Sequence, residues 1–300
     1  MNPKLALPPL LFLGIISISS AAILIRLCED AEPAVIAAAR LGIATAVLVP
    51  GMSLARGRRL LAVPGRLFAP ICLGGVLLAA HFYFWMTSLR HTSVLSSVVI
   101  VTTNPVFVGL GSLLFFKEPL RRTLVFGILL AGLGGLLITL SDAQTRPGST
   151  YGNVMSLFGA MTASGYFLVG RKVRAEVDIL SYMLSVYGIA AILLVGLAIG
   201  LGSPFRGLRT ATYGYFVLLA LVPQLLGHGS LNYALKHVSA TMVAVCILGE
   251  PIGASVLAYF LLHEPVSALQ LAGGGVILAG ILLATWSQPA DLRREEAKLE

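Results

Sequence analysis

Ten apolar segments of about 20 residues each occupy most of this 300-residue chain. They cover residues 7–27, 33–55, 67–89, 93–116, 121–141, 151–170, 179–202, 211–235, 239–262 and 267–287. A helix of about 20 apolar residues crosses the hydrocarbon core of a bilayer. Since lipid cannot satisfy open backbone groups, each segment is expected to be helical. The short linkers leave no room for a soluble domain, so the sequence predicts an all-α membrane protein with ten transmembrane helices.

The low content of charged residues agrees with a membrane protein, and the distribution of the basic residues predicts how the chain is oriented in the membrane. Charged residues make up 11% of the sequence, whereas soluble domains carry about 25%. The net charge of +8 does not indicate nucleic-acid binding here, because the basic residues lie in short linkers. Fifteen of them fall on one side of the predicted spans and five on the other. The positive-inside rule therefore predicts a multi-pass protein of the cell inner membrane, with the bilayer as its surroundings and both termini in the cytoplasm.

A stretch of 30 residues occurs twice, displaced by about 146 positions. The first copy runs from Arg90 through Asn104-Pro105 to Glu118-Pro119. The second copy runs from Lys236 through Glu250-Pro251 to Glu264-Pro265. We therefore predict two repeats of five helices, residues 1–145 and 146–300. With an odd number of spans in each, the second repeat enters from the opposite face, which is typical of transporters built as inverted repeats around a central cavity.

Each copy carries a proline near the middle of its membrane span. Pro105 and Pro251 cannot donate a backbone hydrogen bond, so we expect them to bend their helices and act as hinges. The preceding residues differ, Asn104 in one copy and Glu250 in the other. Glu250 is the one acidic residue of the thirteen near the middle of a span. Either it binds a substrate amine or carries a proton, or it is protonated and hydrogen-bonds a carbonyl freed by the kink.

Polar and aromatic residues in spans three and eight predict the character of the cavity. Gln224, His228 and Asn232 lie four residues apart and would form one polar stripe. The corresponding part of span three offers Phe82 and Trp85. Together with Asn104 and Glu250, these residues suit a small amphipathic ligand with a ring and a polar end. Aromatic residues near the membrane interface can also be ordinary belt residues.

Two further features concern charge and packing. Arg40 is a buried charge in span two, which either reaches the interface or pairs inside the protein. Small residues recur in spans five and ten, including Gly127, Ala131 and Gly135 in the first and Gly273 in the second. Such spacing permits close helix contact, either within one subunit or at a dimer face. We expect a monomer or a weak homodimer formed through spans five and ten.

The order of these features resembles a known family. Its matching elements are Arg40, the mid-helix Pro105 and Pro251, the helix-ending Glu118-Pro119 and Glu264-Pro265, and the glycine-rich spans with Gln270 and Gly273. The chain is similar to the drug/metabolite transporter superfamily, EamA type, and within it to the YddG-type exporters of aromatic amino acids. The resemblance implies export of small metabolites by two inverted bundles, with spans five and ten at the periphery. Span one departs from the family pattern, because Ile15-Ile16-Ser17 stands where a tryptophan-glycine pair is usual.

The leading hypothesis is a carrier that exports aromatic amino acids by alternating access. The alternatives are an exporter of aliphatic amino acids or other small metabolites, and a multidrug proton antiporter. An enzyme is not expected, because the sequence has no His-Glu-x-x-His motif, no paired aspartates and no nucleophile with a plausible base. The three cysteines show no paired spacing, so neither a metal site nor a cofactor is predicted. No charged ring or filter-like loop indicates a channel.

Overall fold

The computed structural model describes residues 3–56, 63–116, 122–145, 149–238 and 240–286, and within them it contains helices and no strand. The prediction of an all-α protein is confirmed. The first repeat contains α1 (Pro3–Ser19), α2 (Ala21–Leu27), α3 (Pro33–Arg56), η1 (Gly65–Leu67), α4 (Phe68–His91), α5 (Val94–Val101), α6 (Asn104–Phe116) and α7 (Arg122–Thr145). The second contains α8 (Ser149–Arg174), α9 (Ile179–Gly200), α10 (Thr210–Leu219), η2 (Ala220–His228), α11 (Gly229–Ala234), α12 (Ala240–Cys246), η3 (Ile247–Gly249), α13 (Glu250–Leu262) and α14 (Ala268–Trp286).

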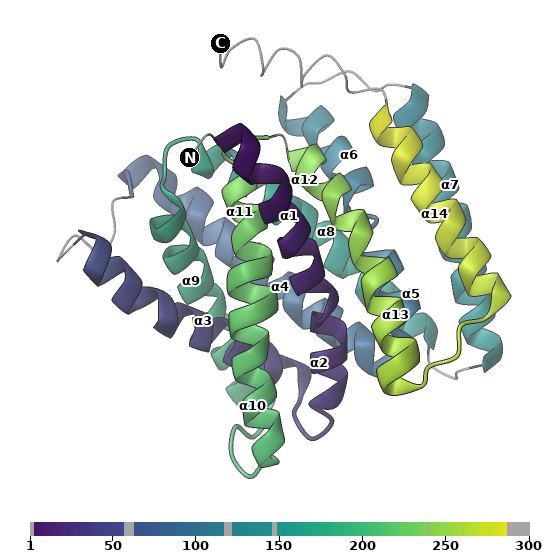
Figure 1. Cartoon of the computed structure of the whole chain (residues 1–300), viewed down its shortest axis with the longest axis horizontal. Helices are drawn as coiled ribbons and strands as arrows, with labels where there is room; N and C mark the ends of the chain where they lie inside the picture. The colour runs from purple at the N-terminus through teal and green to yellow at the C-terminus, as the bar shows by residue number, and fades with distance from the viewer. Residues whose placement is uncertain (1–2, 57–62, 117–121, 146–148, 239, 287–300) are drawn as a thin grey trace.

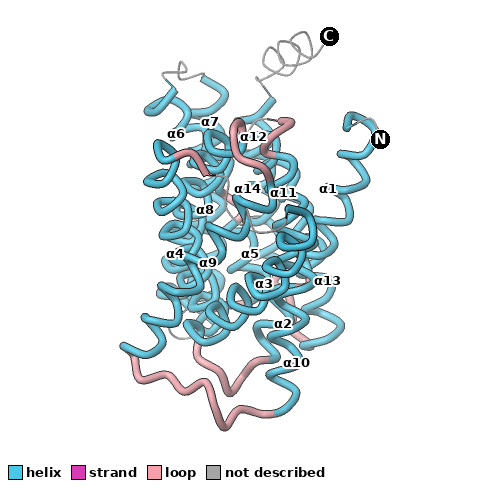
Figure 2. The backbone as a smooth tube through the Cα atoms, turned by 90° about the vertical axis from the view of Figure 1, so that its left-hand side faces the viewer, coloured by secondary structure: helices cyan, strands magenta, loops and turns pink. Residues whose placement is uncertain are grey.

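All ten predicted spans are helical where the structure describes them. Within the residues that the structure describes, seven stretches are long and apolar enough to cross a membrane, and α7 and α14 contain shorter apolar helices. The remaining span is α8, which carries buried serine and asparagine residues among its apolar ones. Most loops gather at the two ends of the molecule (Figure 2). The start of α1 and the end of α14 lie at the same end (Figure 1), as an even number of crossings requires.

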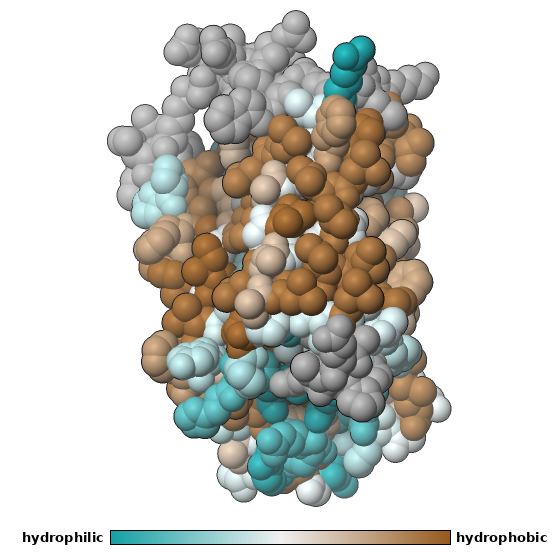
Figure 3. All heavy atoms as spheres, turned by 90° about the vertical axis from the view of Figure 1, so that its right-hand side faces the viewer, coloured by the Kyte–Doolittle hydropathy of each residue, from teal (hydrophilic) through white to brown (hydrophobic). Residues whose placement is uncertain are grey.

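One face of the molecule carries a broad apolar band (Figure 3). On the face formed by α7 and α14, hydrophobic residues fill a broad band and hydrophilic residues gather at the lower end (Figure 3). Leu129 and Leu136 of α7 and Leu271 of α14 are all more than half exposed. In water such a surface would be an aggregation hazard, whereas in lipid it is satisfied.

Helices α7 and α14 pack closely against each other at one edge of the bundle (Figure 1). Their backbones meet at glycine, because a Cβ atom added to Gly134 would lie 2.5 Å from the carbonyl oxygen of Gly273. The small residues of spans five and ten thus serve packing within one subunit, which was one of the two predicted roles. Gln270 of α14 donates to the hydroxyls of Ser93 and Ser96 at 3.2 and 3.3 Å and so ties this pair of helices to α5.

The two spans that contain Pro105 and Pro251 run antiparallel to each other. Helix α5 packs on α13, and α6 packs on α12, so the first half of each span contacts the second half of the other. This is the pairing that an inverted repeat requires. Helices α4 and α8 pack beside these spans, and α9 packs in turn on α4 and α3.

Candidate functional site

The first proline-containing span is broken into two helices rather than bent. Helix α5 ends at Val101, and α6 begins at Asn104 with Pro105 as its second residue. Between them, the hydroxyls of Thr102 and Thr103 donate to the carbonyls of Val99 and Ile100 at 2.9 and 2.7 Å. Proline suits the first turn of a helix, because its missing N–H has no partner there in any case. The backbone ladder is interrupted at the position that the sequence predicts, and the role of Pro105 as a hinge stays a prediction.

The second span is interrupted at the corresponding position. Helix α12 ends at Cys246, the 3-10 turn η3 covers Ile247–Gly249, and α13 begins at Glu250 with Pro251 next. The Ser19 hydroxyl of α1 lies 3.4 Å from the backbone carbonyl of Glu250. The Glu250 side chain is buried and forms no hydrogen bond or ion pair with any residue that the structure describes. Its carboxyl group is therefore available to a ligand.

A small cavity of about 30 Å³ lies between the two breaks. Its polar lining comes from Arg40, His81, Trp85, Thr102, Asn104, His228 and Glu250. A volume of this size holds about one water molecule and no amino acid. A metabolite therefore fits at this place only if the lining residues move apart.

Four of the seven predicted substrate-binding residues line this cavity. They are Trp85, Asn104, His228 and Glu250. The other three, Phe82, Gln224 and Asn232, are completely buried behind the lining. They contact other protein side chains instead of the cavity, so any effect of these three on a ligand in this state is indirect.

Span eight is not a regular α-helix, and its three polar residues do not all face the cavity. Residues Ala220–His228 form a π-helix around Pro223, a form often found at functional sites. Gln224 Oε1 accepts a hydrogen bond of 2.7 Å from Arg40 Nε. Asn232 accepts a hydrogen bond from the Tyr166 hydroxyl and donates one of 2.9 Å to the Tyr187 oxygen. The expected single stripe facing one cavity is therefore wrong, because two of its three members are engaged by buried groups from distant helices.

Arg40 is fully buried and points into the protein. Its guanidinium carbon lies 4.2 Å from the centre of the Phe82 ring, which is close enough for a cation–π interaction. The alternative that Arg40 extends to the membrane interface is wrong, because the side chain is 0% exposed and lines the central cavity. Phe82 also meets the His228 ring edge-on, with centroids 5.3 Å apart. The aromatic ring thus supports two polar residues of the site.

Several buried polar atoms of the lining have no hydrogen-bond partner among the described residues. They are Arg40 Nη1 and Nη2, Trp85 Nε1, Asn104 Oδ1 and His228 Nδ1. Buried polar groups in proteins are nearly always hydrogen-bonded, so several open ones around one cavity indicate a binding site for a polar ligand. The described residues contain no group of three His, Cys, Asp or Glu side chains that could hold a metal ion.

Some site residues have no signal in the sequence. Ile18 and Ala21 of span one and Phe167 of α8 line the cavity as apolar surface. Span one itself is divided at Ser20, between α1 and α2. An apolar residue of a membrane helix that faces a cavity looks the same in sequence as one that faces lipid, so only the packing distinguishes them.

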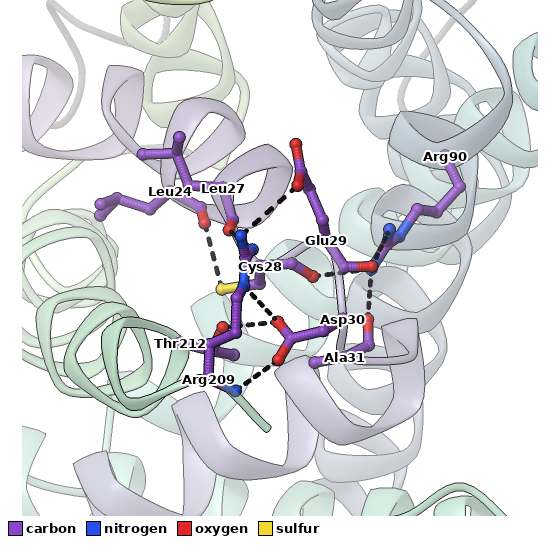
Figure 4. Close-up of polar contacts among 9 residues, drawn as sticks. All are labelled: Leu24, Leu27, Cys28, Glu29, Asp30, Ala31, Arg90, Arg209 and Thr212. Atoms are coloured by element: carbon purple, nitrogen blue, oxygen red, sulfur yellow. Dashed lines mark hydrogen bonds and ion pairs between the residues drawn. The ribbon is translucent and has the colours of Figure 1, made fainter. Parts of the chain in front are cut away.

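One end of the molecule is held together by polar contacts around the loop between α2 and α3 (Figure 4). Arg90 donates to the carbonyls of Cys28, Glu29 and Ala31, and the Thr212 hydroxyl donates to Asp30 at 2.6 Å. The hydrogen bond from Thr212, together with the one from the Arg209 backbone, lowers the pKa of Asp30 to about 2. Burial raises the pKa of the Cys28 thiol to about 12. The loop is thus fixed to the ends of α4 and α10.

A second group of contacts joins α2, α5 and the end of α13. Arg26 at the end of α2 forms an ion pair with Glu264, the residue of the predicted Glu-Pro motif that follows α13. Glu264 also accepts a hydrogen bond of 2.9 Å from the backbone N–H of Val94, at the start of α5. Arg26 donates in addition to the Thr92 carbonyl at 3.1 Å. The matching Glu118-Pro119 lies outside the described residues.

Comparison with known proteins places the chain in a family. The model of the EamA-like transporter family matches residues 8–140 and again residues 150–286, so the chain belongs to this family, whose fold is two repeats of five helices. It is 28% identical to the pseudopaline exporter CntI of Pseudomonas aeruginosa over 214 residues, 70% of this chain and 71% of that protein. It is 24% identical to the uncharacterized inner membrane transporter YedA of Escherichia coli, over 87% of this chain and 84% of that protein. A solved crystal structure with 20% identity superposes with a TM-score of 0.70 over 94% of this chain and 98% of its own, which supports the fold.

Proposed function

We propose that this membrane transporter of the EamA family exports small amphipathic metabolites, with aromatic amino acids as its main substrates. The observation that carries the proposal is the central cavity, where two broken helices meet and open polar atoms lie beside aromatic rings. Trp85 is stacked on His81 with centroids 6.0 Å apart and interplanar angle 5°, so flat apolar surface borders the polar groups. A substrate with a ring and a charged end would complement both.

Transport would proceed by alternating access between two inverted repeats. The cavity is too small for a substrate, so the spans that contain Pro105 and Pro251 would have to separate. Their interrupted backbone ladders make the two breaks suitable hinges. Opening at the end shown in Figure 4 would require Glu264 to leave Arg26 and Val94, because these contacts join α2, α5 and the end of α13. We assign this end to the outside from the distribution of basic residues.

The direction of transport is proposed from two considerations. The relative CntI is named as an exporter, and both termini are predicted to lie in the cytoplasm of an inner membrane. Glu250 would bind the substrate amine or carry a proton during the cycle. Exporters of aliphatic amino acids or other metabolites, and multidrug proton antiporters, are the competing assignments.

Efflux from loaded vesicles tests the proposal. Purified protein in proteoliposomes should release phenylalanine and tryptophan faster than protein-free vesicles do, with saturation and counterflow. Parallel vesicles loaded with leucine or with ethidium examine the competing assignments. Aromatic flux no greater than that of protein-free vesicles, measured with protein shown to be folded by its gel-filtration profile, would reject the assignment to aromatic amino acids.

A further inference from the structure

We infer that the cavity is a carboxylate site and that Arg40 is the residue that recognises the carboxylate of the substrate. The inference rests on the proposed transport function and specifies its substrate class, namely small zwitterions whose carboxylate is required for binding. Three features of the structure support it: the fixed orientation of the guanidinium, the donors that remain open, and the separate position of the acidic residue.

The guanidinium of Arg40 is held in place by two contacts. Gln224 Oε1 accepts from Nε at 2.7 Å, and the Phe82 ring lies under the guanidinium carbon at 4.2 Å. Both partners are themselves completely buried. These contacts occupy one nitrogen and one face of the group. They leave Nη1 and Nη2, the two nitrogens that form the end of the planar fork, without a partner among the described residues.

An open guanidinium fork matches the planar carboxylate of the proposed amino acid substrates, as it also matches a phosphate group. Its two N–H groups point in parallel and can bind both oxygens of a carboxylate at once. Trp85 Nε1 is a further open donor, and Trp85 lines the same cavity as Arg40. Buried N–H groups without a hydrogen-bond partner are unfavourable, so a ligand that accepts from Nη1 and Nη2 gains binding free energy from this site.

The acidic residue of the cavity attracts Arg40 electrostatically but makes no direct ion pair with it, so the open nitrogens of Arg40 stay free for a ligand. Glu250 lines the same cavity, but no ion pair within 4.0 Å joins it to Arg40 or to any other described basic residue. Glu250 lies at the start of α13, whereas Arg40 lies in α3. The cavity thus has a cationic group and an acidic group on different helices. A zwitterion can place its carboxylate at Arg40 and its ammonium group at Glu250.

A purely structural role for Arg40 makes a different prediction. If the arginine only packs against Phe82 and Gln224, its charge would not distinguish between substrates. The protein would then transport an amino acid and its uncharged carboxamide equally well. The carboxylate model predicts that replacing the carboxylate by a carboxamide removes the main attractive contact, while the ring and the stem stay the same and, in an assay at about pH 6, the ammonium group stays charged in both compounds.

The test uses matched pairs with the full-length protein in proteoliposomes. Phenylalanine is compared with phenylalaninamide and leucine with leucinamide, and flux through protein-free vesicles is subtracted to remove leakage of the amides. Because hydrogen bonds to charged groups are worth about 1.5–3 kcal/mol each, the wild type should transport the acids with at least a roughly tenfold higher kcat/KM than the amides. The variant Arg40→Gln should bring this acid-to-amide ratio close to one, whatever its overall rate.

The outcomes separate this inference from the proposed function. Equal transport of acid and amide by the wild type overturns the carboxylate site but leaves aromatic transport intact. A ratio that persists in Arg40→Gln overturns the role of Arg40. An acid preference in the leucine pair without any aromatic flux supports the carboxylate site and rejects the aromatic assignment. Transport of neither pair by folded protein overturns both. If Arg40→Gln does not fold, the comparison of the pairs in the wild type still decides whether the site requires a carboxylate.

Discussion

The contact between α7 and α14 gives a prediction whose size follows from the structure. A Cβ atom at Gly134 would lie 2.5 Å from the Gly273 carbonyl oxygen and 2.9 Å from the Ile277 backbone nitrogen. Both atoms belong to the backbone of α14, so no side-chain rotation can relieve the clash. The variant Gly134→Ala should therefore force the two helices apart. Gly135→Ala is the matched control, because a Cβ atom there meets nothing within 4 Å.

The expected difference between the two variants comes from overpacking alone. Both replace glycine by alanine in the same helix, so the gain in helix propensity, about 1 kcal/mol, is common to both and cancels. Forcing extra atoms into a well-packed contact costs about 1–3 kcal/mol. Gly134→Ala should thus have a free energy of unfolding about 1–3 kcal/mol lower than that of Gly135→Ala.

Unfolding in mixed micelles with increasing SDS, followed by far-ultraviolet circular dichroism, measures this difference. The comparison is made at equal detergent concentration, with the wild type as reference. A Gly134→Ala protein as stable as Gly135→Ala would refute the reasoning, because it would mean that the two backbones do not approach as closely as the structure shows.

Three further predictions concern the site, the outer contacts and the topology. Glu250→Gln should abolish amino acid counterflow or alter its pH dependence while leaving the gel-filtration profile unchanged. If the variant transports as fast as the wild type across pH 5–8, Glu250 has no role in transport. Because Thr212 helps to lower the pKa of Asp30 to about 2, ionised Asp30 stabilises the fold above about pH 4, and this contribution is lost as the pH falls through about 2. The Tm of the wild type should therefore fall more steeply than the Tm of Asp30→Asn between about pH 4 and about pH 2. Parallel curves of Tm against pH would argue against this role of Asp30. In a background with the native cysteines replaced, Ser203→Cys in intact cells should react with an impermeant thiol reagent and Lys172→Cys should not; the reverse pattern would invert the orientation.

The positions of the breaks could be predicted because their cause is local. Pro105 and Pro251 lack a backbone N–H, and this affects the helix wherever it packs. The structure adds that each break separates two helices, with Asn104 and Glu250 as the first residues of the new ones. The burial of Glu250 could also be expected from its place within an apolar segment.

The directions in which the polar side chains of span eight point could not be predicted in the same way. Four-residue spacing places side chains on one face only while the α-helical period holds, and the π-helix Ala220–His228 changes that period. The partners of Gln224 and Asn232 come from helices far away in the sequence, Arg40 in α3 and Tyr166 in α8. No pattern within span eight contains this information.

The sequence alone determined that this chain crosses a membrane as ten helices in two repeats and that its central spans break at proline. Those properties depend on hydrophobic length and on the missing N–H group, which are local. Only the tertiary structure decided that Arg40 turns inward, that Phe82 and Gln224 hold it, and that its open nitrogens share a cavity with Glu250. A helix offers many faces, and the packing of its neighbours selects which polar group meets water, lipid or another side chain.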